Sequence, residues 1–387
     1  MQIILPTAGG ARLHYHLTGT PITSAPRKPA EFNRVAFAAA HVVVNPAADV
    51  DPWSDCPIDW EATLTYRRYL WDLGFGVAEA MDTAQRGGGL DWPAAQDLIR
   101  HSLSAAREHG GALIACGVGT DHLAPGPDVT IDDVIRAYET QLEFVEVQGG
   151  RVILMASRAL AAAAKGPEDY ARVYDRILRQ AKAPVILHWL GEMFDPALRG
   201  YWGNADHMLA METCLDVIAA NATKVDGIKI SLLSADKEIV MRRRLPPSVR
   251  MYTGDDFNYA ELIAGDSFCH SDALLGIFDA IAPAASEGLA RLAKGDEAGF
   301  HHILEPTVAL SRHIFRAPTR FYKTGVVFLA WLNGFQNHFI MLGGQQSARS
   351  LVHFADLFRL ADQARCLRDP ELATHRMRQL LAVGGVE

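Results

Sequence analysis

The chain has few cysteines and no apolar run long enough to cross a membrane. Its five cysteines are scattered without a CxxC pair, so we expect reduced, packed thiols. The amino-terminal segment lacks the layout of a signal peptide. No stretch approaches the roughly 18 uninterrupted apolar residues of a membrane span. These absences predict a cytoplasmic protein.

The chain also lacks an excess of positive charge. It has 37 lysines and arginines against 45 aspartates and glutamates, which gives a net charge of −8. This balance argues against a nucleic-acid-binding surface and favours a protein that acts on small molecules. The three glycines at 87–89 lack the GxGxxG and GKS spacings of phosphate-binding loops, so they predict only a turn.

Short apolar segments alternate with longer amphipathic ones along most of the 387 residues. Eight segments predict buried strands: 34–43, 76–81, 112–119, 151–157, 184–190, 226–231, 249–254 and 267–271. The amphipathic segments 93–110 and 131–150 end in glycine, as many helices do. Eight such strand and helix units predict an α/β protein with a (β/α)8 TIM barrel.

Different patterns flank the eight units. Residues 1–30 predict an N-terminal β-hairpin and a proline-rich linker, residues 31–283 the barrel, and residues 284–387 a C-terminal helical extension. Within that extension, residues 321–342 are apolar on nearly all sides. A helix of this kind exposes a large apolar patch unless something covers it. We therefore expect it to lie between the barrel and a neighbouring subunit, in a homodimer or homotetramer.

Polar side chains gather where the predicted strands end. In a TIM barrel, the C-terminal ends of the strands and the loops that follow them form the active site. The polar residues at those positions are His41, Asn45, Glu79, Asp82, Thr83, Asp121, His122, Ser157, Arg158, His188, Glu192, Lys229, Ser231, Thr253, Asp255, Asp256, His270 and Ser271. Their convergence at one mouth predicts a site for a small molecule.

Lys229 lies within an otherwise apolar strand, in the segment VDGIKISLLS (225–234). An unpaired ammonium is costly to bury, so such a lysine is paired, neutral or chemically active. Desolvation can lower its pKa from about 10.4 and yield a nucleophilic amine that forms a Schiff base. The alternative is a structural lysine that snorkels or pairs with Asp255 or Glu79.

Several motifs, in this order along the chain, resemble the dihydrodipicolinate synthase / N-acetylneuraminate lyase family. They are NP (45–46), DTAQ (82–85), GVG (117–119), GIK (227–229) and YTGDD (252–256). The resemblance extends from about residue 34 to 280 and identifies a divergent branch. It implies a barrel enzyme, an aldolase or dehydratase, in which Lys229 forms an imine with a 2-keto acid. We expect no cofactor and no metal in such a site.

The sequence departs from that family at two places. The family's Pro-Tyr-Tyr at the end of the fourth strand is replaced by SRA (157–159), so its proton-relaying tyrosine is missing. Arg158 can hold an anion but is a poor general acid because it stays charged. DTAQ keeps Thr83 as a carboxylate donor but adds Asp82, whose charge repels a substrate carboxylate. The substrate need not be pyruvate, and a neutral keto sugar or its ring-opened acid fits these changes better.

Roles can be assigned to the residues at the mouth on this basis. Lys229 is the expected nucleophile, His188 a proton shuttle because its ordinary pKa is near neutrality, and Glu79 a second acid or base. The expected substrate-binding residues are Asp82, Thr83, Arg158, Glu192, Asp255, Asp256 and His270. One of the two aspartates at 255 and 256 is expected to cap the helix that follows instead.

Two other functions are compatible with the same mouth. Five residues carry donor atoms of the kind found in metal-dependent sugar isomerases and hydrolases, namely Glu79, His122, His188, Glu192 and His270. No HxH or HExxH spacing supports a metal, and Lys229 would then orient or polarise the substrate. A barrel that binds a metabolite without catalysis is the third possibility, and the density of titratable groups argues against it.

Overall fold

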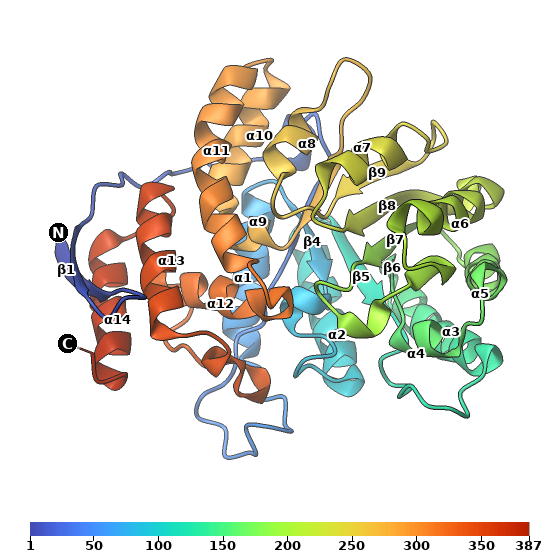
Figure 1. The fold of residues 1–387 in the computed structure, drawn as a ribbon, viewed down its shortest axis with the longest axis horizontal. Helices are drawn as coiled ribbons and strands as arrows, with labels where there is room; N and C mark the ends of the chain where they lie inside the picture. The colour runs from blue at the N-terminus through green and yellow to red at the C-terminus, as the bar shows by residue number, and fades with distance from the viewer. Residues whose placement is uncertain (387) are drawn as a thin grey trace.

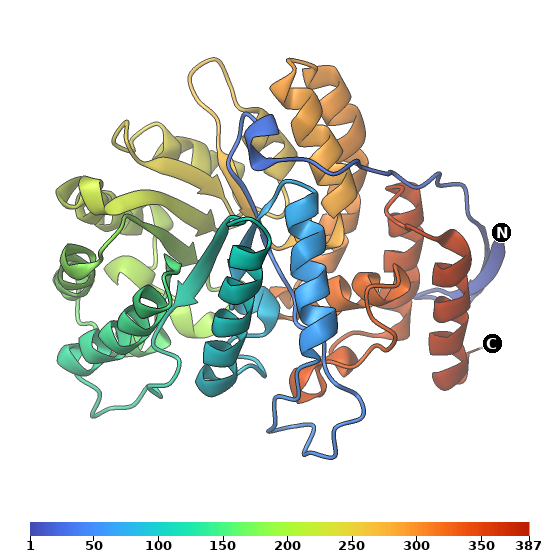
Figure 2. The ribbon, with the colours of Figure 1, turned by 180° about the vertical axis from the view of Figure 1, so that it is seen from behind.

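The computed structural model describes residues 1–386, and a closed barrel of eight parallel strands forms its centre (Figures 1 and 2). The strands neighbour one another in the order β10-β3-β4-β5-β6-β7-β8-β9. Their bounds are β3 (Ala36–Ala39), β4 (Gly76–Glu79), β5 (Ile114–Val118), β6 (Arg151–Met155), β7 (Val185–Leu190), β8 (Val225–Ser231), β9 (Arg250–Thr253) and β10 (Asp272–Leu275). The predicted TIM barrel is confirmed.

One strand was predicted in the wrong place. Residues 267–271 form a loop, and the eighth strand, β10, begins directly after it at Asp272. The side chain of Asp266 accepts hydrogen bonds from the backbone N–H groups of Phe268 (2.8 Å) and Cys269 (3.0 Å), which fixes the loop as a turn. His270 therefore precedes the strand and lies at the N-terminal end of the barrel, away from the predicted mouth.

Eight helices connect the strands and cover the outside of the barrel. They are α1 (Trp60–Asp72), α2 (Trp92–Glu108), α3 (Ile131–Val147), α4 (Arg158–Ala163), α5 (Pro167–Gln180), α6 (His207–Ala220), α7 (Ala235–Arg242) and α8 (Tyr259–Ala264). The side chains of Asp59, Asp91 and Thr130 accept N–H groups of the first turns of α1, α2 and α3. The predicted helices at 93–110 and 131–150 correspond to α2 and α3.

The barrel interior is packed with apolar side chains that range in size from alanine to tyrosine. They are Phe37, Ala39, Ala78, Met81, Ala115, Ile153, Ile186, Tyr252 and Leu274. Successive residues of a strand point to opposite faces, so the residue two positions after the inward-facing Ile186 also faces inward. His188 therefore points into the barrel, whereas Glu79, next to Ala78, points outward.

The N-terminal hairpin packs against the C-terminal helices. Its strands are β1 (Gln2–Pro6) and β2 (Arg12–His16), and both ends of the chain lie beside α13 and α14 (Figures 1 and 2). The helices of the extension are α9 (Ile277–Ala280), α10 (Ala282–Ala293), α11 (Glu297–Ile314), α12 (Tyr322–Leu332), α13 (Leu351–Gln363) and α14 (Pro370–Val383). The hairpin and the helical extension are confirmed, and the three-domain division stays a prediction.

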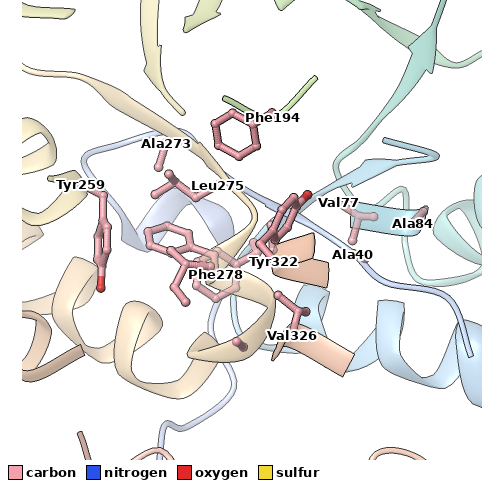
Figure 3. Packing of buried hydrophobic residues seen from close by; sticks show 14 of the residues in the cluster. Ala40, Val77, Ala84, Phe194, Tyr259, Ala273, Leu275, Phe278, Tyr322 and Val326 are labelled. Atoms are coloured by element: carbon pink, nitrogen blue, oxygen red, sulfur yellow. The ribbon is translucent and has the colours of Figure 1, made fainter. Parts of the chain in front are cut away.

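Helix α12 is covered by the chain itself. The helix predicted over 321–342 is shorter than expected, and all residues of Tyr322–Leu332 are buried. Tyr322 and Val326 lie close to Phe194 and Phe278, at the meeting point of barrel and extension (Figure 3). The helix is thus buried within the chain, as the expected contact with the barrel requires, and a neighbouring subunit is not needed to cover it. The homodimer or homotetramer stays a prediction, without this support.

No helix within residues 1–386 is both long enough and apolar enough to pass through a membrane.

Candidate active site

Lys229 and His188 lie directly opposite each other on the neighbouring strands β8 and β7. Both side chains face the barrel interior near its C-terminal end, and Lys229 is only 4% exposed. Within residues 1–386, no carboxylate oxygen lies within 4.0 Å of Lys229 Nζ, so the predicted pairing with Asp255 or Glu79 is absent. Burial lowers the pKa of Lys229, although Asp82 and Asp256 oppose the shift. The site therefore contains a buried amine that is not ion-paired.

His188 is a neutral hydrogen-bonding group. Its Nε2 lies 3.3 Å from Ser231 Oγ, and the side chain is buried. Burial and the nearby Lys229 lower the pKa of His188 well below its ordinary value, and Asp82 offsets this only in part. The prediction of a shuttle with a near-neutral pKa is thus wrong in its premise, and the imidazole is suited to hydrogen bonding.

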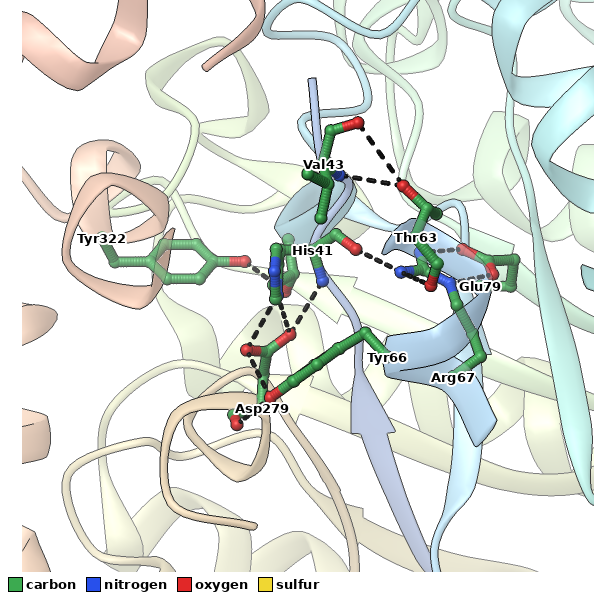
Figure 4. A network of polar contacts seen from close by, with 9 residues as sticks. His41, Val43, Thr63, Tyr66, Arg67, Glu79, Asp279 and Tyr322 are labelled. Atoms are coloured by element: carbon green, nitrogen blue, oxygen red, sulfur yellow. Dashed lines mark hydrogen bonds and ion pairs between the residues drawn. The ribbon is translucent and has the colours of Figure 1, made fainter. Parts of the chain in front are cut away.

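A tyrosine from the C-terminal extension reaches this site. The hydroxyl of Tyr322, at the start of α12, lies 2.8 Å from Asp82 Oδ2 and 2.7 Å from Thr83 Oγ1. The residue is 2% exposed and points from the extension toward the barrel (Figures 3 and 4). Sequence reasoning missed it, although a tyrosine and a lysine at 322 and 323 open an otherwise apolar helix. Thr83 is engaged by this phenol.

The charge of Asp82 is balanced by nearby cationic groups. Burial raises the pKa of Asp82, but Lys323, Lys229 and the hydrogen bond from Tyr322 outweigh it, and the pKa is lowered. Lys323 is 8% exposed, and burial lowers its own pKa against the opposing charges of Asp82 and Asp195. Asp82 is thus a carboxylate with a cationic neighbour. The ionised state on which the predicted repulsion of a substrate carboxylate depends is thus favoured, and the repulsion itself stays a prediction.

The two aspartates after β9 have different environments. Asp255 accepts hydrogen bonds from the backbone N–H groups of Phe257 (2.9 Å) and Asn258 (3.1 Å), which holds the turn before α8. Asp255 is therefore engaged in the turn that leads into α8, close to the role expected for one of the two aspartates in place of substrate binding. Asp256 is 3% exposed and accepts the N–H of Ile277 at 2.9 Å. Burial raises the pKa of Asp256 to about 8, against the lowering effect of Lys229.

A cavity of about 150 Å³ opens at the ends of β4, β5, β6 and β7, and it is bordered by Asp82 and His188 but not by Lys229, Asp256 or Tyr322. Its lining residues are Asp82, Arg86, Gly87, Gly119, Thr120, Asp121, Leu123, Pro125, Met155, Ala156, Ser157, Arg158, His188, Leu190, Asp195 and Leu198. Three of the predicted site residues, Asp82, Arg158 and His188, thus border one space. Arg158 pairs with Asp195 at 2.5 Å. The hydroxyls of Thr120 and Ser157 lie 2.6 Å apart at the wall.

Glu79 lies outside the site. Its carboxylate accepts two hydrogen bonds from Arg67 of α1, at 2.9 and 3.0 Å, and both side chains are fully buried (Figure 4). The neighbouring Asp279 binds His41 Nδ1 at 2.8 Å and accepts a backbone N–H from His41 at the same distance. These contacts join the barrel to α1 and α9. The predicted acid or base role of Glu79 is contradicted by its outward direction.

Two further predicted substrate contacts are not at the cavity. Glu192 accepts a hydrogen bond from His207 Nε2 at 3.0 Å. His207 Nδ1 in turn lies 2.8 Å from Lys237 Nζ, and Glu192 does not line the cavity. His270 borders a different groove, together with Arg34 and Arg250, at the opposite end of the barrel.

The donor atoms of the metal alternative are dispersed. Glu79 points outward, Glu192 is paired with His207, and His270 lies at the far end of the barrel. Among residues 1–386, no group of three or more histidine, cysteine, aspartate or glutamate side chains is arranged to hold a metal ion. The predicted five-residue set is therefore not assembled.

Comparisons with known proteins agree with this architecture. Residues 3–386 match the model of a family described as "Protein of unknown function (DUF993)". No curated protein matches the chain. Among solved structures, a prophage protein of the dihydrodipicolinic acid synthase family from E. coli, in complex with pyruvate, aligns with a TM-score of 0.66 and 14% identity over 86% of this chain and 99% of its own.

Two other solved structures are similar to the same extent. The 4-hydroxy-tetrahydrodipicolinate synthase of Methylacidiphilum fumariolicum aligns with a TM-score of 0.65 and 13% identity, over 90% of this chain and 99% of its own. A putative dihydrodipicolinate synthetase from Pseudomonas aeruginosa gives 0.63 and 14%, over 86% and 99%. The resemblance noted in the sequence is confirmed, and at these identities it establishes the fold.

Proposed function

Because the chain belongs to the DUF993 family, which is described as having unknown function, we propose its activity from its site: a lyase of the aldolase or dehydratase type that forms a Schiff base through Lys229. One observation carries the proposal. The amine of Lys229 is buried at the C-terminal end of a barrel strand, without an ion pair, beside a neutral imidazole. A desolvated amine of this kind is the activated form of a lysine nucleophile.

The first steps follow from the groups around Lys229. Neutral Nζ attacks the carbonyl carbon of the substrate, and the carbonyl oxygen takes up a proton to give a carbinolamine. Loss of water then needs an acid, and Asp256, with its pKa of about 8, can supply the proton near neutral pH. The resulting iminium accepts the electron pair released when a neighbouring C–C or C–O bond breaks.

The cavity suits a small hydroxylated carbonyl compound. Thr120 and Ser157 present hydroxyl groups at its wall, and Arg158 lies at its more exposed side. Since Lys323 balances Asp82, a carboxylate on the substrate is compatible with the site. The substrate class is therefore a keto acid or a sugar-derived carbonyl compound. One of the similar structures holds pyruvate, which makes pyruvate the first compound to test.

Borohydride trapping tests the proposal directly. The protein is incubated with pyruvate, dihydroxyacetone or fructose, reduced with borohydride, and analysed by intact mass and peptide mapping. We expect a covalent adduct on Lys229 that is absent in Lys229→Met. The matched control is Lys237→Met, which removes a lysine whose amine contacts His207 away from the cavity and should keep the adduct. An adduct on Lys323 alone, or none with any of the three compounds, overturns the proposal.

A further inference from the structure

The C-terminal extension places Tyr322 against Asp82, and this contact defines a further role in the reaction. We infer that Asp82 is the base that removes a proton from the carbon next to the iminium, and that Tyr322 is the residue that positions it. The inference rests on the proposed Schiff base at Lys229. It assigns a catalytic task to a residue expected only to bind substrate, and it extends the active site beyond the barrel.

The hydrogen-bond pattern fixes which oxygen of Asp82 is free. A phenol has one proton, and a carboxylate only accepts. Tyr322 therefore donates to Asp82 Oδ2 and accepts the proton of Thr83 Oγ1. Among residues 1–386, no group donates a hydrogen bond to Asp82 Oδ1. This oxygen is not among the buried polar atoms that lack a partner, so it is accessible from outside the protein interior. Oδ1 is the oxygen left for substrate, and Asp82 borders the cavity.

Aromatic packing fixes the direction of the phenol. The ring of Tyr322 stacks on Phe315 with centroids 4.3 Å apart and contacts Phe194 edge-on at 6.0 Å. A phenol clamped in this way holds its hydrogen bond without further loss of side-chain freedom. Because Lys323 follows directly in the chain, the same turn of α12 brings a cation toward Asp82. The extension thus both orients this carboxylate and favours its ionised form.

The proposed step balances without any further reactant. The C–H bond next to the iminium carbon breaks, and the proton passes to Asp82 Oδ1. The electron pair of that bond forms a carbon–carbon double bond, and the C=N⁺ pair returns to nitrogen, which gives a neutral enamine on Lys229. Addition of the enamine to a second carbonyl compound, or its reprotonation, completes an aldol reaction or an exchange. A substrate with a hydrogen on that carbon is therefore required.

Exchange of that hydrogen for deuterium measures the step in isolation. Pyruvate or dihydroxyacetone is incubated with the protein in D2O, and loss of the C–H signal is followed by NMR. We expect the wild type to exchange the compound that it traps, Asp82→Asn to lose exchange, and Tyr322→Phe to slow it roughly tenfold or more. All three proteins should still form the borohydride adduct, because Lys229 is intact.

A matched tyrosine separates this role from simple packing. Tyr259 is also fully buried, and its hydroxyl contacts Thr307 away from the cavity. Tyr259→Phe should leave the exchange rate unchanged. Loss of the Tyr322 hydrogen bond raises the pH at which Asp82 loses its proton, so the acid limb of the exchange profile should move to higher pH in Tyr322→Phe alone.

The outcomes distinguish the two proposals. If the wild type forms no adduct, the Schiff-base function fails. If it forms the adduct but does not exchange, or if Tyr322→Phe exchanges at the wild-type rate with an unchanged pH profile, the inference about Asp82 and Tyr322 is wrong. If Tyr259→Phe and Tyr322→Phe lose exchange equally and both proteins are less stable, Tyr322 acts only through packing. That result also overturns the inference.

Discussion

The backbone of Gly254 leaves the space that the side chain of Lys229 occupies. A Cβ atom at Gly254 would lie 2.7 Å from Lys229 Cε, 2.6 Å from the carbonyl oxygen of Ile230 and 2.4 Å from Ser231 Oγ. Two of these three contacts involve β8 atoms that cannot move without disturbing the strand or its lysine. Position 254, in the loop between β9 and α8, therefore has to be glycine if the side chain of Lys229 is to lie where it does.

Gly254→Ala should displace Lys229 and strain the barrel. We expect the rate of borohydride trapping to fall roughly tenfold, and the free energy of unfolding to fall by about 1–3 kcal/mol, as overpacking in a core usually costs. Chemical denaturation and adduct mass measure the two effects. The control is Gly126→Ala, where the nearest heavy atom, Val129 Cγ2, lies 3.8 Å from the added carbon. If Gly254→Ala is trapped by borohydride at the wild-type rate, the added methyl group is accommodated without moving Lys229 and the prediction is wrong.

The amine of Lys229 should react at a lower pH than an ordinary lysine. Burial lowers its pKa, so half of the amine is neutral at a pH below the ordinary lysine value of about 10.4. A 1,3-diketone such as 2,4-pentanedione forms a conjugated enaminone with neutral lysine and needs no knowledge of the substrate. The rate of enaminone formation, followed by absorbance against pH, should reach half its maximum below that value. A midpoint at or above it, or a signal retained in Lys229→Met, contradicts the assignment.

The buried pair of Glu79 and Arg67 should matter for stability and not for chemistry. Glu79→Gln leaves the Arg67 guanidinium without its counter-charge in a fully buried place. Removing one partner of such a pair typically costs about 3–5 kcal/mol. We expect that loss in urea denaturation, while the folded fraction still forms the Lys229 adduct at the wild-type rate. Loss of trapping in a variant that remains folded would restore Glu79 as a catalytic candidate.

Glu238 of α7 should make the fold less stable as the pH rises. It is 1% exposed, accepts hydrogen bonds from Ser271 Oγ (2.6 Å) and Thr253 Oγ1 (2.9 Å), and burial raises its pKa from 4.5 to about 8. The folded state therefore binds the proton more tightly than the unfolded state does. The resulting stability is complete below pH 4.5 and is lost as the pH rises through about 8.

Glu238→Gln should flatten this dependence, because a neutral amide has no proton to lose. The difference in free energy of unfolding between variant and wild type, measured in urea at pH 5 and at pH 8, should shift in favour of the variant at the higher pH. The comparison cancels the titration of Asp256, which is common to both proteins. A difference that is the same at both pH values would show that Glu238 is ionised in the folded protein.

The order of strands and the exceptional position of Lys229 could be predicted from the sequence, because burial on both faces requires continuous apolar segments and makes a lysine within one conspicuous. The direction of Glu79 could not. It stands between Ala78 and Ala80 in a strand buried on both faces, so the pattern carries no sign of which face is the interior. His270 was misplaced because a turn held by Asp266 resembles a short strand in composition.

The partnership of Asp82 and Tyr322 was beyond prediction for another reason. The two residues are 240 positions apart in the chain, and no sequence period or motif spacing links them. The apolar pattern of residues 321–342 correctly indicated a buried helix. It could not indicate that the other helices of the extension, α9, α11, α13 and α14, pack around this helix within one chain.

The contact between the first hairpin and α13 sets an order of events during synthesis. Asp362 accepts hydrogen bonds from the Tyr15 hydroxyl (2.7 Å) and from the backbone N–H groups of Thr18 and Gly19 (3.0 Å each). A ribosome makes the hairpin before the barrel, and it makes Tyr322 and Asp362 after β10, which ends at Leu275. The barrel of a nascent chain can thus form before Tyr322 is available to bind Asp82 and before Asp362 is available to bind the hairpin. In the proposed reaction, Lys229 is therefore in place before Tyr322 aligns Asp82, and proton removal waits for α12.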